Sequence, residues 1–158
     1  MAKEMFDKSN LNAGATDELN KLPDGGPFAV INLLRYKDWA EYPPGKMTEK
    51  LTGRQAYERY LELSVPFVNK VSGVPLWRGT LAVNLIGPED ECWDEVLIMQ
   101  YPNRGAFQRM MTDPNYLAIV FHRDAGVLDS RLYGVTSPQS IGPMKWKLLN
   151  LSRKVRGR

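Results

Sequence analysis

The stretch CWDEVLIMQYPNRGAFQRMMTDPNYLAIVFHRDAGVLDSRLY, residues 92–133, holds the pattern that decides the fold. Its apolar segment 95–99 is short and is bounded by polar residues and Pro102, which is typical of a buried strand. Asn103 can then cap a helix that begins at Arg104. The stretch therefore begins with a strand, a turn and a short helix.

A second helix and a closing strand complete this stretch. Asp113 and Pro114 predict a new helix start, because Asp accepts from free backbone N–H groups and proline needs no N–H in the first turn. Apolar residues then recur at helical spacing over 116–128, and 131–135 returns as a strand. We also expect Asp129 to cap or close the helix before that strand.

The strand predicted for residues 28–36 is apolar at both odd and even positions, so both of its faces should be covered. Asn32 interrupts this run, and a buried amide without a partner costs about 1–3 kcal/mol. We expect Asn32 either to bond a neighbouring loop or to line a pocket and orient a ligand. The loop 37–51 that follows is long enough to be a lid or a partner contact.

A helix and a second strand separate this loop from the stretch described first. Residues 52–71 begin with a capping box, and Pro66 predicts a kink or a break within the helix. Residues 76–86 form the next predicted strand, in which Gly79 marks a bulge or a close backbone approach. Its more apolar face would hold Trp77, Leu81, Val83 and Leu85.

The element order β-α-β-β-α-β predicts an α+β, ferredoxin-like fold, with a four-stranded, mostly antiparallel sheet and helices on one face. Two helical regions can cover only one face, yet the first and third strands are apolar on both. A second copy of the chain is the simplest cover for the other face. We therefore expect a homodimer that forms through the open sheet face.

Charge and composition divide the chain into three parts. Residues 1–26 form an extension with one short helix, 27–137 form the domain, and 138–158 form a basic tail. Seven basic residues and no acid lie in 130–158, which leaves 14 basic and 18 acidic residues in the remainder. This mildly acidic body argues against nucleic-acid binding, and the third strand lacks the aromatic pair of an RNA-binding sheet.

The rest of the composition indicates a cytoplasmic protein outside the membrane. A single cysteine, Cys92, excludes an internal disulfide and fits a reducing compartment. The first residues lack the apolar stretch of a secretory signal, and no run approaches the ~20 apolar residues of a membrane span. One His and one Cys exclude the usual zinc sets, and no phosphate-binding glycine loop occurs, so neither metal nor cofactor is expected.

Seven short motifs carry a resemblance to a known family, and they lie at 27–34, 53–57, 93–96, 101–104, 113–116, 122–123 and 129–130. At this spacing they resemble the family of domain of unknown function 1330, in the dimeric α+β-barrel superfamily. The resemblance covers about 27–136, and it implies the same fold and a dimer. Members of that superfamily include cofactor-independent monooxygenases, muconolactone-type isomerases, polyketide cyclases and chlorite dismutases, which tend to bind ligands between the sheet and the helices.

His122 and Arg123 are the leading candidates for chemistry. His122 is the only side chain whose ordinary pKa lies near neutrality, so it could act as a general base. Arg123 could hold an anion, although neighbours on a helix point about 100° apart and need not share a pocket. The alternative is a surface histidine beside an arginine that pairs with Asp94 or Asp129.

Two function classes follow from these residues. The first is a metal- and cofactor-independent enzyme of oxygenase, isomerase or cyclase type, acting on a small apolar aromatic or enolisable substrate. Asn32 and Arg123 would steady an oxyanion, and His122 would move the proton. The alternative is a non-catalytic ligand-binding or protein-interaction module with a basic tail. Aromatic residues would line the pocket or fill the core: Tyr57, Tyr60, Phe67, Trp77 and Trp93.

Overall fold

The computed structural model of the chain describes residues 14–136. The predicted basic tail 138–158 and the first part of the N-terminal extension lie outside the described residues. The elements are α1 (Ala15–Lys21), β1 (Phe28–Tyr36), α2 (Gly53–Lys70), β2 (Val74–Thr80), β3 (Glu95–Tyr101), α3 (Arg104–Met111), α4 (Pro114–Leu117), α5 (Val120–Gly126) and β4 (Val127–Thr136).

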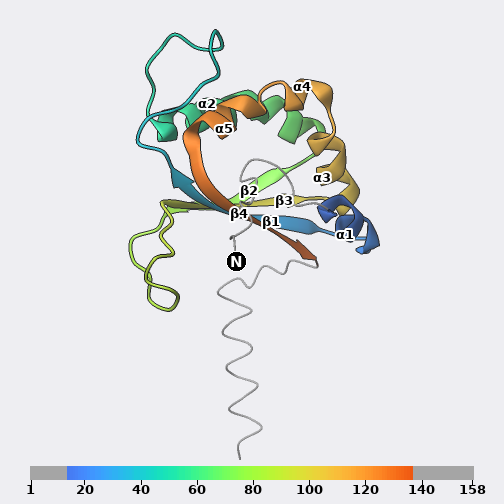
Figure 1. Ribbon diagram of the computed structural model, residues 1–158. Helices are drawn as coiled ribbons and strands as arrows, with labels where there is room; N and C mark the ends of the chain where they lie inside the picture. Colours follow the sequence, from blue (N-terminus) through green and yellow to red (C-terminus); the bar gives the residue numbers. More distant parts are fainter. Residues whose placement is uncertain (1–13, 137–158) are drawn as a thin grey trace, which may run out of the picture.

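The strands form one four-stranded sheet in the order β2-β3-β1-β4, and every neighbouring pair is antiparallel. Helices α2 to α5 lie over one side of this sheet, and α1 lies beside α3 at one end (Figure 1). This is the strand order of the split βαβ arrangement, in which both helical connections cross the same side of the sheet. The predicted ferredoxin-like α+β fold is confirmed.

The two inner strands, β1 and β3, define which side chains face the helices. Even-numbered residues of β1 pair with odd-numbered residues of β3, and both sets point to the helices; we call this side the helix face. Their other residues point to the opposite side, which we call the open face. Successive residues of a strand alternate between sides, so the apolar residues of β1 are shared between the two faces.

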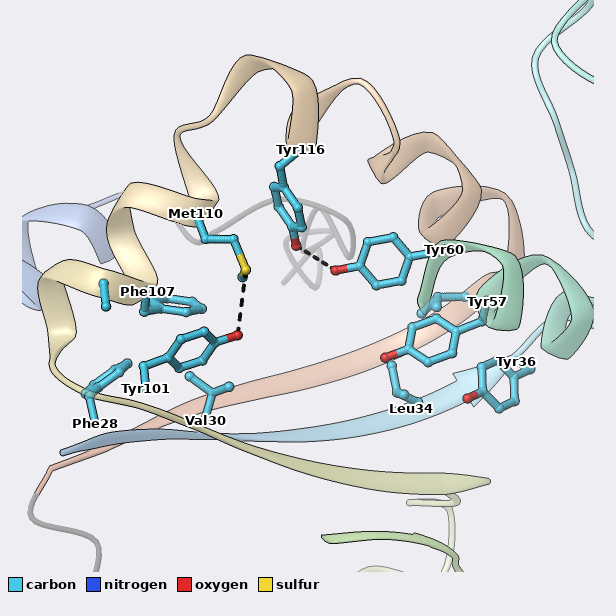
Figure 2. Packing of buried hydrophobic residues seen from close by; sticks show 12 residues of the cluster. Phe28, Val30, Leu34, Tyr36, Tyr57, Tyr60, Tyr101, Phe107, Met110 and Tyr116 are labelled. Atoms are coloured by element: carbon cyan, nitrogen blue, oxygen red, sulfur yellow. Dashed lines mark hydrogen bonds between the residues drawn. The ribbon is translucent and has the colours of Figure 1, made fainter. Parts of the chain in front are cut away.

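Aromatic side chains fill the space between the helix face and the helices (Figure 2). Leu34 and Tyr57 are fully buried at one end of this core, and Tyr101 and Phe107 pack together at the other with ring centroids 5.3 Å apart. Burial of each such side chain contributes about 1.5–3 kcal/mol. The core therefore holds the helices against one side of the sheet only.

The predicted helix starts are confirmed by their hydrogen bonds. Gln55 N donates to Thr52 Oγ1 at 3.2 Å, and Thr52 N donates to Gln55 Oε1 at 2.8 Å, which completes the capping box. Asn103 Oδ1 accepts from Ala106 N at 2.7 Å. Asp113 begins α4 in the same way. Caps are recognisable in sequence because the donor and acceptor lie within three residues.

The predicted second strand is too long. Its last pair joins Thr80 to Glu95, the first residue of β3, and only one further backbone bond follows among the described residues, from Leu81 N to Asp94 O at 3.0 Å. The residues that follow form a loop instead, and its apolar side chains are exposed: Leu81, Val83, Leu85 and Ile86. The pairing of β2 with β3 is irregular between Pro75 and Trp77, so the predicted bulge at Gly79 does not occur there.

The predicted helices also differ in their bounds. Helix α2 continues through Pro66 without a break, and the helix predicted over 116–128 is two helices, α4 and α5. Helix α5 ends at Gly126. A Cβ atom added to this glycine would lie 2.3 Å from the carbonyl oxygen of Gly53, so the two backbones approach closely here. Because β4 begins directly afterwards, Asp129 lies inside a strand, and the expectation that it closes the helix is wrong.

Candidate functional site

Asn32 lies on the helix face, near the middle of β1. Its cross-strand partners are Leu97 in β3 and Leu132 in β4, so its amide stands among apolar side chains. The Oδ1 atom is buried and has no hydrogen-bond partner among the described residues. An unpaired acceptor of this kind costs about 1–3 kcal/mol. Of the two roles predicted for Asn32, bonding to a neighbouring loop does not occur within the described residues.

Arg123 extends from α5 towards the same side of the sheet. Its Nη2 donates to Ser130 Oγ on β4 at 2.9 Å, and its side chain is 12% exposed. Ser130 pairs with Leu34 of β1, the next helix-face residue after Asn32. Neither Asp94 nor Asp129 forms an ion pair with Arg123, so that predicted pairing is wrong.

The tyrosines of the core surround this charge. Burial raises the pKa of Tyr57 well above its ordinary value, while the positive charge of Arg123 opposes the shift. Tyr60 and Tyr116 share a 2.6 Å hydrogen bond between their hydroxyl groups (Figure 2), and burial raises the pKa of both. These phenols remain protonated at neutral pH, so they can donate hydrogen bonds but cannot act as bases.

A cavity of about 530 Å³ opens between α1, α3 and the helix face of β1 and β4. Its floor is formed by the two strands, its inner wall by aromatic rings, and its roof by α1. The lining residues are Gly14, Ala15, Glu18, Leu19, Leu22, Phe28, Val30, Phe107, Leu132 and Gly134.

This cavity reaches the neighbours of Asn32. Val30 precedes Asn32 by two residues on the same face of β1, and Leu132 is its cross-strand partner in β4. Both line the cavity. The unpaired amide oxygen therefore lies next to the inner end of a space of suitable size for a small ligand.

A second polar group on the helix face is fully paired. The buried carboxylate of Glu95 accepts from Arg54 Nη1 at 2.8 Å and from Arg78 Nε at 2.6 Å, and Arg78 also bonds Glu58. Buried charges are retained in proteins when they are paired and hydrogen-bonded in this way. This group ties α2 to β2 and β3, and its side chains are satisfied by one another.

His122 has different neighbours from Arg123. Its Nδ1 and the hydroxyl of Tyr42, in the loop 37–51, are hydrogen-bonded at 2.8 Å, and its ring lies 4.1 Å from that of Phe121. Burial lowers its pKa below the ordinary value, and the positive charge of Arg59 lowers it further. His122 thus joins the loop to α5, and it forms no hydrogen bond with Asn32 among the described residues.

The predicted aromatic residues are divided between the two faces. Tyr57 and Tyr60 lie in the core, and Phe67 packs on Tyr116 with centroids 5.9 Å apart. Trp77 pairs with Ile98 of the open face and is 57% exposed. Trp93 lies under Arg131, whose guanidinium carbon is 4.9 Å from the ring. The two tryptophans therefore do not share a pocket with the tyrosines.

The sequence interpretation missed the residues that line the cavity. The alternation within β1 places Phe28 and Val30 on the same side as Asn32, so this signal was present in the sequence. Leu132 and Gly134 could be found only once the register of β4 against β1 was known. Helix α1 belongs to the predicted N-terminal extension, yet its Leu19 packs on the core and lines the cavity.

The described residues contain no cluster of His, Cys, Asp or Glu that could hold a metal ion. No helix between residues 14 and 136 is both long and apolar enough to cross a membrane.

Comparisons with known proteins place the chain among relatives without assigned chemistry. The family described as "Domain of unknown function (DUF1330)" matches residues 47–132. Two solved structures of the RPA0582 protein, described as a protein of unknown function from Rhodopseudomonas palustris, are similar over most of this chain. The methylated protein is 36% identical, covers 87% of this chain and 99% of its own, and has a TM-score of 0.77. The other structure is 34% identical, covers 83% and 97%, and has a TM-score of 0.74.

More distant structures are similar over about three quarters of the chain. A dabb family protein with a ferredoxin-like fold from Mesorhizobium loti is 14% identical, covers 73% of this chain and 99% of its own, and has a TM-score of 0.45. SnoaB, a cofactor-independent oxygenase from Streptomyces nogalater, is 15% identical, covers 75% and 98%, and has a TM-score of 0.43. No curated protein matches the chain.

Proposed function

The chain belongs to the DUF1330 family, and from that premise we propose that it binds a small apolar molecule that carries one hydroxyl or enol group. The proposed site is the cavity between α1, α3 and the helix face of β1 and β4. The observation that carries the proposal is the buried Oδ1 of Asn32, which has no partner among the described residues and lies beside the cavity.

The walls of the cavity favour an apolar ligand. Phe28, Phe107, Val30 and Leu132 provide aromatic and aliphatic surface, and a volume of about 530 Å³ is within the usual range for small-molecule sites. Such sites combine apolar walls with a few polar groups that fix the orientation of the ligand. Asn32 is not itself a lining residue, and its amide is the polar group next to Val30 and Leu132, which line the inner end.

A ligand hydroxyl would satisfy the amide. The Oδ1 atom accepts hydrogen bonds only, so it needs a donor such as a phenol or an enol. A donor that reaches it removes the cost of an unpaired buried acceptor, which a purely apolar ligand cannot do. The ligand class is therefore an apolar ring with one hydroxyl.

The test compares 2-naphthol with naphthalene, which differ by one hydroxyl, in binding to the full chain by calorimetry. We expect the protein to prefer 2-naphthol by about tenfold, since a net hydrogen bond contributes roughly 0.5–1.5 kcal/mol. The Asn32→Val variant should lose this preference, and the exposed Asn69→Val control on α2 should keep it. An unchanged preference in Asn32→Val would contradict the role of the amide.

A second candidate function is a cofactor-independent enzyme of oxygenase, isomerase or cyclase type. The interior position of the Arg123 guanidinium favours it, because a fixed positive charge in a region of low dielectric stabilises an enolate. Asn32 and Arg123 would hold the oxyanion. His122 stays the predicted proton carrier, and unchanged turnover of an identified substrate by His122→Ala would remove it from that role.

The open face supports the proposal of a homodimer. Ile31 pairs with Ile98 and Tyr133 across the sheet, and Trp77 and Tyr133 are more than half exposed there. Such a face is ordinarily covered by a second apolar layer, about 10 Å away in packed sheets. Sedimentation of the full chain at micromolar concentration should give the mass of a dimer. A monomer would count against this interface.

The non-catalytic alternative assigns partner binding to the basic tail. Deletion of 138–158 tests it, because loss of a partner without loss of 2-naphthol affinity would separate the tail from the cavity.

A further inference from the structure

Gly134 lies in the floor of the cavity. It pairs with Val30 across β1 and β4, on the helix face. A Cβ atom added to Gly134 would lie 2.8 Å from Cζ and 3.1 Å from Cε2 of the Phe28 ring. Real Cβ atoms do not approach other heavy atoms so closely, so any side chain at this position must displace Phe28.

Phe28 has little freedom to move away. It is buried, and its ring packs against that of Phe107 with centroids 5.6 Å apart. Tyr101 also packs on Phe107, with centroids 5.3 Å apart. A displaced Phe28 ring would enter the cavity that it now borders. Close-packed cores respond to an added methyl group by such shifts.

The roof opposite this floor combines small and larger residues. Gly14 and Ala15 line the cavity at the start of α1, and Leu19 and Leu22 line it further along the chain. Glu18 is the only charged residue among the described lining residues, and it pairs with Lys21. This cavity, which we call the slot, therefore has room for a flat ring and offers a ligand no unpaired charge.

We infer that Gly134 determines the size of the ligand because it leaves room for the Phe28 ring above it, and that the ligand is an uncharged, flat aromatic ring system packing beside that ring. Leu132, two residues earlier on the same face, limits the slot at its inner side towards Asn32. This inference rests on the proposed function, because it concerns the same cavity.

The test uses three flat fluorescent amines of increasing size, namely 1-aminonaphthalene, 1-aminoanthracene and 1-aminopyrene. Each is titrated against the full chain and against Gly134→Ala, Leu132→Ala and Gly25→Ala. Gly25 is the matched control, since its added Cβ would meet nothing within 4 Å and its backbone is not left-handed.

We expect Gly134→Ala to weaken 1-aminoanthracene binding by roughly tenfold or more, while 1-aminonaphthalene changes by less than about threefold. Leu132→Ala should shift the preference the other way, towards 1-aminopyrene, because it enlarges the slot. Gly25→Ala should match the unaltered chain for all three probes.

Two results would overturn the inference. Gly134→Ala could bind all three probes as the unaltered chain does, in which case Gly134 does not limit the slot. If Gly134→Ala does not fold, Leu132→Ala decides, and an unchanged order of preference in that variant would contradict the inference. An unaltered chain that binds none of the probes and no 2-naphthol would remove the proposed function as well.

Discussion

The helix face and the open face of the sheet use the same strands but differ in how they are covered. Leu34 on the helix face is fully buried, whereas Tyr133 on the open face is 54% exposed. Both faces of β1 are apolar, so composition does not cause the difference. Within residues 14–136 the helices cover only one face, and the other presents apolar surface that a second molecule can cover.

The two faces also treat polar groups differently. On the helix face the oxygen of Asn32 and the hydroxyl of Tyr57 are buried without partners among the described residues. On the open face Arg131 pairs with Asp129 at 2.8 Å and lies over Trp93. Unpaired buried groups reduce stability, and the two named here both lie on the helix face.

The largest expected effect comes from truncating neighbouring leucines of β1. Leu34→Ala should lower the free energy of unfolding by about 2–5 kcal/mol, because it leaves a cavity in a closed core. Leu33→Ala, on the open face, should cost clearly less in a dilute, monomeric sample. Urea unfolding of both variants measures this contrast, and equal losses would mean that the open face is as closed as the helix face.

A charge on the open face should separate the proposed dimer. Ile31→Lys places an ammonium group at the centre of that face, and we expect the dimer to dissociate at least about a hundredfold more readily, or roughly 2.7 kcal/mol. The circular-dichroism spectrum should stay unchanged. Sedimentation measures the dissociation, with Lys50→Ala in the exposed loop as a control. A dimer that persists in Ile31→Lys would show that the interface lies elsewhere.

Removal of an unpaired hydroxyl on the helix face should stabilise the folded protein. Tyr57→Phe keeps the buried ring and deletes an oxygen without a partner, so it should raise the free energy of unfolding by about 1 kcal/mol. Thermal and urea unfolding measure this change. A loss of stability would show that the hydroxyl has a partner in solution, and the contrast between the faces would then be weaker.

The smallest effect concerns His122, which lies outside both faces. Its pKa is lowered in the folded protein by burial and by Arg59, so the unfolded chain binds the proton more readily. Its contribution to stability is therefore complete above the ordinary pKa of 6.5 and is lost as the pH falls below it. Urea midpoints at pH 7.5 and 5.0 should differ more in the unaltered chain than in His122→Gln.

The fold was largely predictable from sequence, and the site was predictable only in part. Apolar β1 and the caps at Thr52, Asn103 and Asp113 gave the element order. Asn32 was found because an amide inside an apolar strand is conspicuous. His122 was assigned to the same site as Asn32, yet its recorded partners lie in the loop around Tyr42.

The features that the sequence determined by itself are local ones, namely the helix caps and the alternation of side chains along a strand. Capping bonds and the alternation of a strand involve residues close in the chain, so their pattern is visible without a structure. Tertiary structure alone decided that Trp77 lies on the open face, that β2 stops where β3 begins, and that Gly134 lies beneath Phe28. These depend on register and on the rotation of each helix, which are determined by contacts between residues far apart in the chain.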